Sequence, residues 1–129
     1  MPKVEYSKAK GLVQSTGSGF VMAAESIAAA GALDPGVALS LVTPGAASVA
    51  YTLADGTTEG QLKWIVTLHA TNDAVVTPAT TAGAWANATL GNVGESICCV
   101  WTASGWALLS RGGGATAAAD AVAGLPVIA

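Results

Sequence analysis

The chain has 129 residues, of which 52% are hydrophobic and only 10% are charged, and its formal net charge is −3 at pH 7. Because a soluble domain usually carries about 25% charged residues, this composition suits a subunit covered by copies of itself or by a partner. Weak acidity without a basic patch argues against nucleic-acid binding, and no segment reaches the roughly 20 apolar residues of a membrane span. The first residues lack the apolar core of a secretion signal, so we expect residence in a cytosol.

Residues 1–19 are expected to form an extended N-terminal arm. They contain three of the five basic residues, and glycine, serine and threonine interrupt residues 11–19. Backbone hydrogen bonds and scattered apolar anchors would hold such an arm on another surface, whereas a disordered terminus is the alternative. The residues expected to make this contact are Val4, Tyr6, Lys8, Lys10, Leu12, Val13 and Phe20.

Residues 20–111 show the pattern of a β-rich module. Residues 20–30 are ambiguous between a short helix and a strand because they are rich in alanine, and a turn is predicted at 34–36. Strands are predicted over residues 37–43, 48–53, 62–69, 74–77, 88–90, 95–102 and 106–110. Turn signals recur about every ten residues, which predicts an all-β fold, an antiparallel β-sandwich or barrel-like module.

Four tryptophans mark the strongest strands. The strand from residue 62 has apolar residues at every second position, and Trp101 and Trp106 flank a tight turn, which predicts a hairpin with an aromatic at each base. The tryptophans could form a sugar-stacking platform, but their sequence neighbours are apolar rather than polar, which favours packing. The residues expected in the core or in a subunit interface are Trp64, Trp101, Trp106, Leu62 and Val66.

Catalytic chemistry is not indicated by any residue. The single histidine, His69, has no activated nucleophile motif to serve, and Asp55 and Glu59 are expected to be solubilising loop charges rather than a glycosidase pair. Adjacent Cys98 and Cys99 are expected to be reduced core residues, since a bridge between neighbours would be strained. We therefore expect no enzyme, no catalytic residue, no metal site and no cofactor.

Residues 112–129 are predicted to be a flexible Gly/Ala-rich linker followed by an apolar tail at 125–129. Such a tail either docks in a groove, of its own fold or of a neighbour's, or remains a frayed terminus.

The order of several motifs resembles that of a known protein class. The motifs are TLADGT at 52–57, EGQLKWIV at 59–66, VVTPA at 75–79, GNVGESI at 91–97 and WTASGWALL at 101–109. Together they resemble small structural proteins in the virions of tailed bacteriophages, cyanophages among them, over residues 39–110. Residues 4–20 look similar to the leading arm of such proteins, while the Ala/Gly-rich C-terminal tail departs from the pattern.

This resemblance implies a capsid decoration (cement) protein or a related appendage. It implies a homotrimer of β-rich subunits on the outer capsid surface, assembled in the host cytoplasm, that clamps adjacent major capsid proteins. The expected partners are therefore the major capsid protein and further copies of the chain, with no nucleic acid, membrane or small-molecule substrate. A head or tail appendage that binds host-surface glycan through the tryptophans is the alternative, and a small enzyme ranks last.

Overall fold

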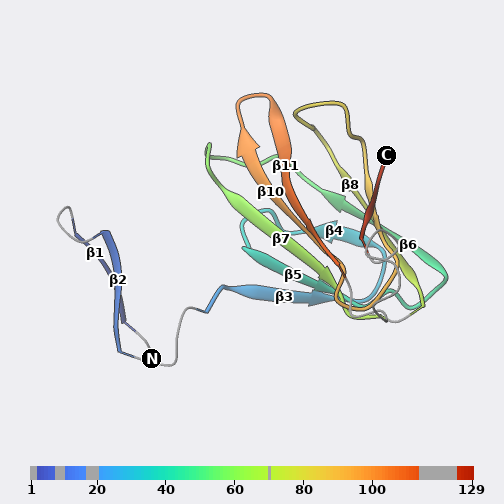
Figure 1. The fold of residues 1–129 in the computed structure, drawn as a ribbon, viewed down its shortest axis with the longest axis horizontal. Helices are drawn as coiled ribbons and strands as arrows, with labels where there is room; N and C mark the ends of the chain where they lie inside the picture. Colours follow the sequence, from blue (N-terminus) through green and yellow to red (C-terminus); the bar gives the residue numbers. More distant parts are fainter. Residues whose placement is uncertain (1–2, 8–10, 17–20, 70, 114–124) are drawn as a thin grey trace.

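The chain folds into β-strands in the computed structural model, which describes residues 3–7, 11–16, 21–69, 71–113 and 125–129. No helix occurs among these residues (Figure 1), so none of them forms a helix long and apolar enough to cross a membrane. The expected all-β class is confirmed. The strands are β1 (Lys3–Ser7), β2 (Gly11–Thr16), β3 (Ala24–Ile27), β4 (Gly31–Leu33), β5 (Leu39–Val42), β6 (Ser48–Leu53), β7 (Leu62–Thr67), β8 (Asp73–Pro78), β9 (Ala88–Leu90), β10 (Ser96–Thr102), β11 (Gly105–Gly112) and β12 (Val127–Ile128).

Ten strands form two sheets of five. Sheet I has the order β11-β10-β7-β5-β3 and sheet II the order β12-β9-β8-β6-β4. The two sheets remain separate and enclose a common core, so the sandwich is confirmed (Figure 1). Both sheets are mixed rather than purely antiparallel, because β3, β5 and β7 pair in parallel, as do β4, β6 and β8.

The parallel pairs arise because successive strands from β3 to β8 alternate between the sheets. The chain thus winds through three coils, each with one strand in sheet I and one in sheet II. Leu39 pairs with Trp64 in sheet I and Ser48 with Asp73 in sheet II, so the partner lies 25 residues further along in both sheets. A parallel pair needs a crossover of about a dozen residues or more, and here a strand of the opposite sheet supplies it. Closely spaced turns therefore join the two sheets instead of closing hairpins.

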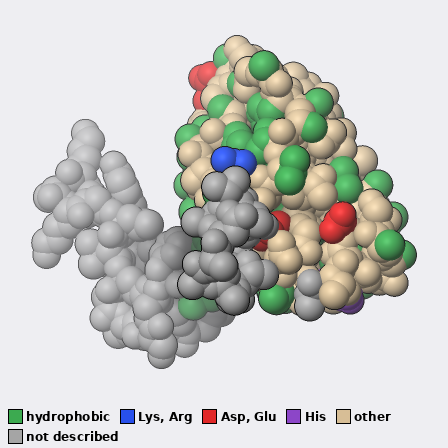
Figure 2. Space-filling view, turned by 45° about the vertical axis from the view of Figure 1, so that its right-hand side comes forward, with side chains coloured by type: hydrophobic (Ala, Val, Ile, Leu, Met, Phe, Trp, Pro, Cys, Tyr) green, Lys and Arg blue, Asp and Glu red, His purple; other side chains and the backbone are tan. Residues whose placement is uncertain are grey.

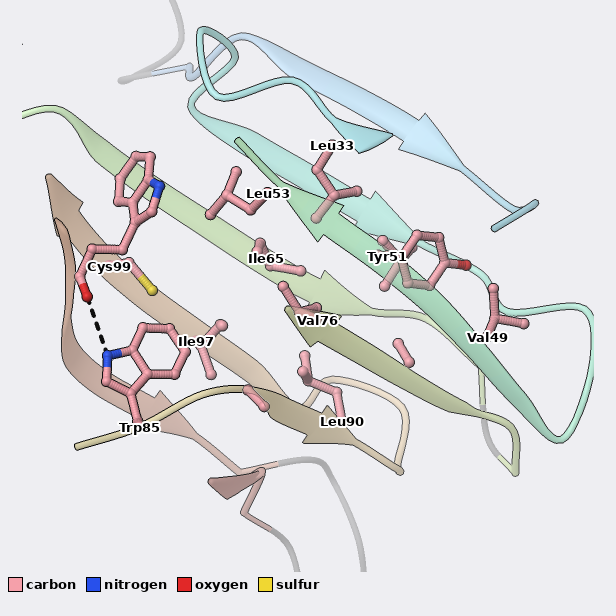
Figure 3. Close-up of a cluster of buried hydrophobic side chains, with 14 residues drawn as sticks. Leu33, Val49, Tyr51, Leu53, Ile65, Val76, Trp85, Leu90, Ile97 and Cys99 are labelled. Atoms are coloured by element: carbon pink, nitrogen blue, oxygen red, sulfur yellow. Dashed lines mark hydrogen bonds between the residues drawn. The ribbon is translucent and has the colours of Figure 1, made fainter. Parts of the chain in front are cut away.

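The core lies between the sheets, where inward side chains of both meet (Figure 3). Strand β6 alternates strictly, with Val49, Tyr51 and Leu53 buried and the residues between them exposed. They face Ile65 and Ile97 of sheet I across the core. Burial of each large apolar side chain contributes about 1.5–3 kcal/mol, so this layer supplies most of the sandwich's stability.

The predicted strands agree closely with the observed ones. Residues 48–53 and 88–90 have the predicted bounds, and the other predicted strands differ by one to two residues at an end. The predicted hairpin forms, with Trp101 opposite Trp106 and their rings edge to face at 5.4 Å between centroids. Residues 20–30 contain β3, so tertiary pairing with β5 prevails over the helix propensity of alanine.

The C-terminal tail docks in its own fold. Val127 and Ile128 pair with β9, and the backbone N–H of Ala129 donates to the Asn87 carbonyl at 3.0 Å. The Arg111 guanidinium donates to the carbonyl of buried Pro126 at 3.0 Å, which links β11 of sheet I to the tail. The predicted flexible linker falls largely on residues 114–124, which lie outside the described residues.

Candidate functional site

The only histidine organises a loop. His69 Nδ1 accepts the backbone N–H groups of Asn72 at 2.9 Å and Thr71 at 3.2 Å, which shapes the connection from β7 to β8. The Asn72 amide donates in turn to the Pro44 carbonyl at 2.9 Å. Over the described ranges, no group of three or more histidines, cysteines or acids could hold a metal ion.

The two loop acids also hold turns together. Glu59 Oε1 accepts the backbone N–H of Ala103, in the β10–β11 turn, at 2.8 Å. Asp55 Oδ2 accepts the Thr80 hydroxyl proton at 3.2 Å. These carboxylates therefore do more than solubilise the loop, because each ties residues 55–59 to a neighbouring loop at one end of the sandwich.

The GNVGESI motif forms the turn between β9 and β10. Glu95 is only 2% exposed, and its carboxylate accepts the Gly91 backbone N–H and the Asn92 amide, both at 2.7 Å. A buried carboxylate with two hydrogen-bond donors is satisfied. This motif from the virion-protein resemblance therefore has a structural role in the chain.

Lys63 lies completely buried on the inner side of sheet I. Its ammonium donates to the carbonyls of Asp34 at 2.8 Å and Val37 at 2.7 Å, and it pairs with Glu25 Oε1 at 3.4 Å. The same Glu25 oxygen accepts the Ser40 hydroxyl and the Asp34 backbone N–H. Burial lowers the pKa of Lys63, an effect that Glu25 opposes. All three ammonium protons have acceptors, so Lys63 of β7 fastens the third coil to β3 and to the connection between β4 and β5, and leaves no donor for a ligand.

Three of the four tryptophans are committed to packing at one end of the sandwich. Trp106 is fully buried and donates through Nε1 to the Ala54 carbonyl at 2.9 Å, and Trp85 Nε1 donates to the Trp106 carbonyl at 3.1 Å (Figure 3). Gly56 covers the Trp101 side chain so closely that a Cβ there would lie 2.4 Å from Trp101 Cγ. These three rings therefore do not form an open stacking platform.

The outer face of sheet I is the most unusual surface of the molecule. Strand register places its residues in three rows that cross the sheet. The first row is Ala24, Leu39, Trp64, Cys98 and Ser110, the second is Ser26, Leu41, Val66, Ser96 and Gly112, and the third is Leu62, Val100 and Ala107. No position in these rows is charged. Leu62 is 46% exposed, and most of the other large apolar residues in the rows are half-buried.

The charged residues of sheet I do not lie in its outer rows. Its strands contain three charged residues, Glu25, Lys63 and Arg111, and all three occupy positions that alternate with the outer rows. Lys63 is buried, and Arg111 reaches across to Pro126. A sheet with one face in contact with solvent normally has apolar residues on the inner face and polar residues on the outer face. Sheet I departs from this pattern because its outer rows carry leucine, valine and tryptophan, while its inner face holds apolar core residues together with Lys63.

Sheet II has the usual pattern on its outer face. The positions that alternate with its buried residues are mostly threonine, serine and alanine, and Asp73 is among them. Charged side chains are also sparse on the surface that Figure 2 shows. The two sheets therefore differ in the chemistry of their outer faces, although their strand arrangement is the same.

This geometry separates the residues predicted for the core or a subunit interface. Trp106 belongs to the core cluster, and Trp101 packs against it. Leu62, Trp64 and Val66 lie on the outer face of sheet I, so a core position for them is wrong. The physical reason is that β7 turns Lys63, Ile65 and Thr67 inward instead. An interface remains the open alternative for these three residues.

The cysteines lie on opposite sides of sheet I. Cys99 belongs to the core, whereas Cys98 is 3% exposed in the middle of the outer face and lies outside the core cluster. Both are free. Burial raises the pKa of the Cys98 thiol, and burial together with the neighbouring Cys98 raises the pKa of Cys99 to about 12. Both thiols are therefore poor nucleophiles at neutral pH.

The N-terminal segment forms a hairpin. Among the strands that the structure describes, β1 and β2 pair only with each other. Val4 and Tyr6 lie in β1, with Leu12 and Val13 in β2. Lys8, Lys10 and Phe20 lie outside the described residues. The predicted arm thus contains a chain reversal in place of one extended strand.

Comparisons with known proteins add no identification, because no protein family matches the chain and no curated protein matches it.

Proposed function

We propose that this chain is a virion structural protein that decorates the outer surface of a phage capsid as a homotrimer. In this role it stabilises contacts between major capsid proteins. The N-terminal segment grips the shell, and the sandwich provides a rigid body that projects from it.

The observation that carries this proposal is the separate N-terminal hairpin. An isolated two-stranded hairpin is marginally stable at best in water, and β1 and β2 pair only with each other among the described strands. This isolated pairing supports a hairpin that becomes stable when it binds a second surface. The exposed edges of β1 and β2 can then pair with strands of another protein. The order of sequence motifs over residues 39–110 supports the phage setting.

The use of polar side chains also supports a mechanical role. His69, Glu59, Asp55, Glu95 and Lys63 all bond to loops or turns of the chain itself. Burial of apolar surface in an interface stabilises the complex by about 25 cal/mol per Å2. Several copies bound to one capsid lattice add avidity.

Co-sedimentation with purified phage heads tests the proposal. Deletion of residues 2–19 should abolish binding to heads while the sandwich keeps its near-UV circular dichroism. A matched variant with Thr77→Glu, on the outer face of sheet II, should bind as the wild type does. Undiminished binding by the truncated protein would contradict the proposal.

The second candidate is an appendage that binds host-surface glycan. Half-buried Trp64 favours it, since this ring alone among the four tryptophans lies on an outer sheet face. Intrinsic fluorescence titrated with polysaccharide should change in the wild type and not in Trp64→Phe if this candidate holds. No change in either protein would favour decoration.

A further inference from the structure

We propose that the edge of β9 is a peptide-binding site that takes up the tail, residues 125–129, of a second copy of this chain. In the structure the chain's own tail occupies this edge as β12 and completes sheet II. The proposal goes beyond capsid decoration, because it concerns how one copy holds another and involves no capsid protein.

Backbone hydrogen bonds hold the tail on β9. The Ala129 N–H donates to the Asn87 carbonyl at 3.0 Å, and the Asn87 N–H donates back to the Ala129 carbonyl at 3.2 Å. Val127 lies opposite Thr89, so the tail continues the antiparallel ladder of sheet II. Strand addition of this kind takes its affinity from main-chain hydrogen bonds, which are the same whichever molecule supplies the added strand.

Side chains give the site its selectivity. Pro126 is buried and Ile128 packs against the core, whereas Val127 between them is 64% exposed. The Arg111 guanidinium donates to the Pro126 carbonyl at 3.0 Å, and proline has no N–H that its buried position would leave unpaired. The site therefore selects an uncharged extended segment with proline two residues before a branched aliphatic residue.

A second copy is the occupant that these contacts favour. Its tail has the same sequence, so it makes the same hydrogen bonds and the same apolar contacts as the resident tail. Exchange of an identical element between copies requires no new complementary surface.

The connection to the tail is long enough for this exchange. Residues 114–124 separate Gly113 from Leu125, and a chain of this length spans at most about 40 Å. A strand of six residues is about 20 Å long. The tail can therefore reach β9 of a copy that lies beside its own sandwich.

Concentration decides which copy's tail is bound. The tail makes the same contacts in either copy, so its own copy is favoured only by the effective concentration, which is in the mM range for elements joined by a short linker. Exchange therefore requires copies held at a similar local concentration, or an acceptor whose own tail is displaced. The second condition gives a direct test.

The acceptor in this test is the full-length, isotope-labelled Ile128→Asp variant, observed by NMR. A carboxylate at the apolar position of Ile128 should displace the own tail, so the amide signals of Asn87 and Thr89 should move from their wild-type positions. An acetylated peptide with the sequence of residues 125–129 should return them towards the wild type. Its dissociation constant should be on the order of 1 mM, because β12 has only 2 residues. The same peptide carrying Ile128→Asp should have no effect.

The donor is a second full-length copy, unlabelled and carrying Thr89→Pro. Asn87 bonds to the tail, and alternate residues of an antiparallel strand face the same neighbour. Thr89→Pro therefore removes an N–H that faces the tail and spares the pairing of β9 with β8. The released tail of this donor should return the Asn87 and Thr89 signals of the acceptor as the peptide does. A donor that carries Ile128→Asp in addition should not.

Val127→Asp is the matched control for the acceptor, because Val127 is exposed and its own tail should remain docked. Peptide and donor should leave the Asn87 and Thr89 signals of this control almost unchanged. Near-UV circular dichroism checks folding, and Ile128→Ser replaces Ile128→Asp if the latter loses the native spectrum. Equal shifts in acceptor and control, or no shift in a folded acceptor, would overturn the proposal, as would binding of the peptide but not of the donor chain.

Discussion

Sheets I and II have the same arrangement of strands but differ in the polarity of their outer faces. Each has three parallel strands followed by two antiparallel ones. In sheet II, apolar residues such as Tyr51 and Val76 face the core and threonines face outward. In sheet I, Lys63 and Ser40 face inward, while Leu62 and Trp64 face outward. Threonine, serine and alanine predominate on the outer face of sheet II, whereas uncharged, mostly apolar residues make up the outer face of sheet I.

The difference shows what a period-two pattern can and cannot establish. Alternation in a strand predicts that two sets of side chains occupy opposite faces, and β7 obeys it. It does not say which set faces the core, because an apolar stripe is suitable for a core and for a subunit interface alike. In sheet II the two sets differ clearly in polarity, so the face was unambiguous.

The largest expected effect comes from removing the buried cation of sheet I. Lys63→Ala leaves the carbonyls of Asp34 and Val37 without a donor and Glu25 without its counter-charge. Removal of one partner from a buried pair usually costs about 3–5 kcal/mol, and Glu25 is partly exposed, which points to the lower end. Urea unfolding at one fixed protein concentration measures the loss.

The control for this substitution lies on sheet II. Thr77→Ala removes an outward side chain and should change the free energy of unfolding by less than about 0.5 kcal/mol. Similar small losses in both variants would contradict an essential inner cation.

A second comparison concerns the place where sheet I meets the loop that follows β8. Gly105 has φ +120°, and a Cβ there would lie 2.8 Å from the Thr81 backbone carbon. Gly60 has φ +89° with nothing within 4 Å of its Cβ position. Both alanine variants carry backbone strain of about 1 kcal/mol, but Gly105→Ala adds a clash that costs about 1–3 kcal/mol.

Thermal unfolding of the two variants separates strain from clash. Gly105→Ala should lose about 3 kcal/mol and Gly60→Ala about 1 kcal/mol relative to the wild type. Equal losses of unfolding free energy would mean that the loop at Thr81 shifts to relieve the clash. The two sheets would then be less firmly joined there than the contact indicates.

The sequence predicted the strands well because they depend on local patterns. The bounds of β6 and β9, and the Trp101–Trp106 hairpin, follow from alternation and turn residues that lie within a few positions of each other. The parallel coils could not be predicted, since the spacing of turns is the same whether a turn closes a hairpin or joins two sheets. That choice is made by pairing over 25 residues, as between Leu39 and Trp64.

The site was predicted less completely for the same reason. Leu62, Trp64 and Val66 were recognised as an apolar stripe, but their neighbours across the sheet are known only from the register. The inward position of Glu25 and Lys63 had no local signal, because a single lysine in a strand normally faces water. Only pairing of three strands shows that the charges share one face.

Alkaline pH should distinguish the two faces of sheet I through their adjacent cysteines. Burial raises the pKa of Cys99 from 9.0 to about 12 in the fold, so above pH 9 the unfolded chain binds fewer protons and stability falls as pH rises. The lowered pKa of Lys63 acts in the opposite direction up to 10.5. At pH 10.5, Cys99 alone accounts for a loss of about 2 kcal/mol.

The contribution of Cys99 is isolated by a double difference. The fall in unfolding free energy between pH 8 and pH 10.5 should be about 2 kcal/mol smaller in Cys99→Ala than in the wild type. Groups common to both proteins, such as Tyr51 and Lys63, cancel in this comparison. Cys98→Ala, on the outer face, should reduce the fall by less. An identical fall in all three proteins would place Cys99 in contact with water.

The smallest effect should come from the terminal strand of sheet II, where neighbouring side chains point in opposite directions. Ile128 packs partly buried against the core, whereas Val127 is 64% exposed. Ile128→Ala removes buried methyl groups at an edge that can partly close, so the cost should be about 1–2 kcal/mol, below the 2–5 kcal/mol of a central core position. Val127→Ala should cost less than about 0.5 kcal/mol. Urea midpoints measured side by side would show this order if β12 is an integral fifth strand, and coincident midpoints would mean that the tail leaves sheet II in solution.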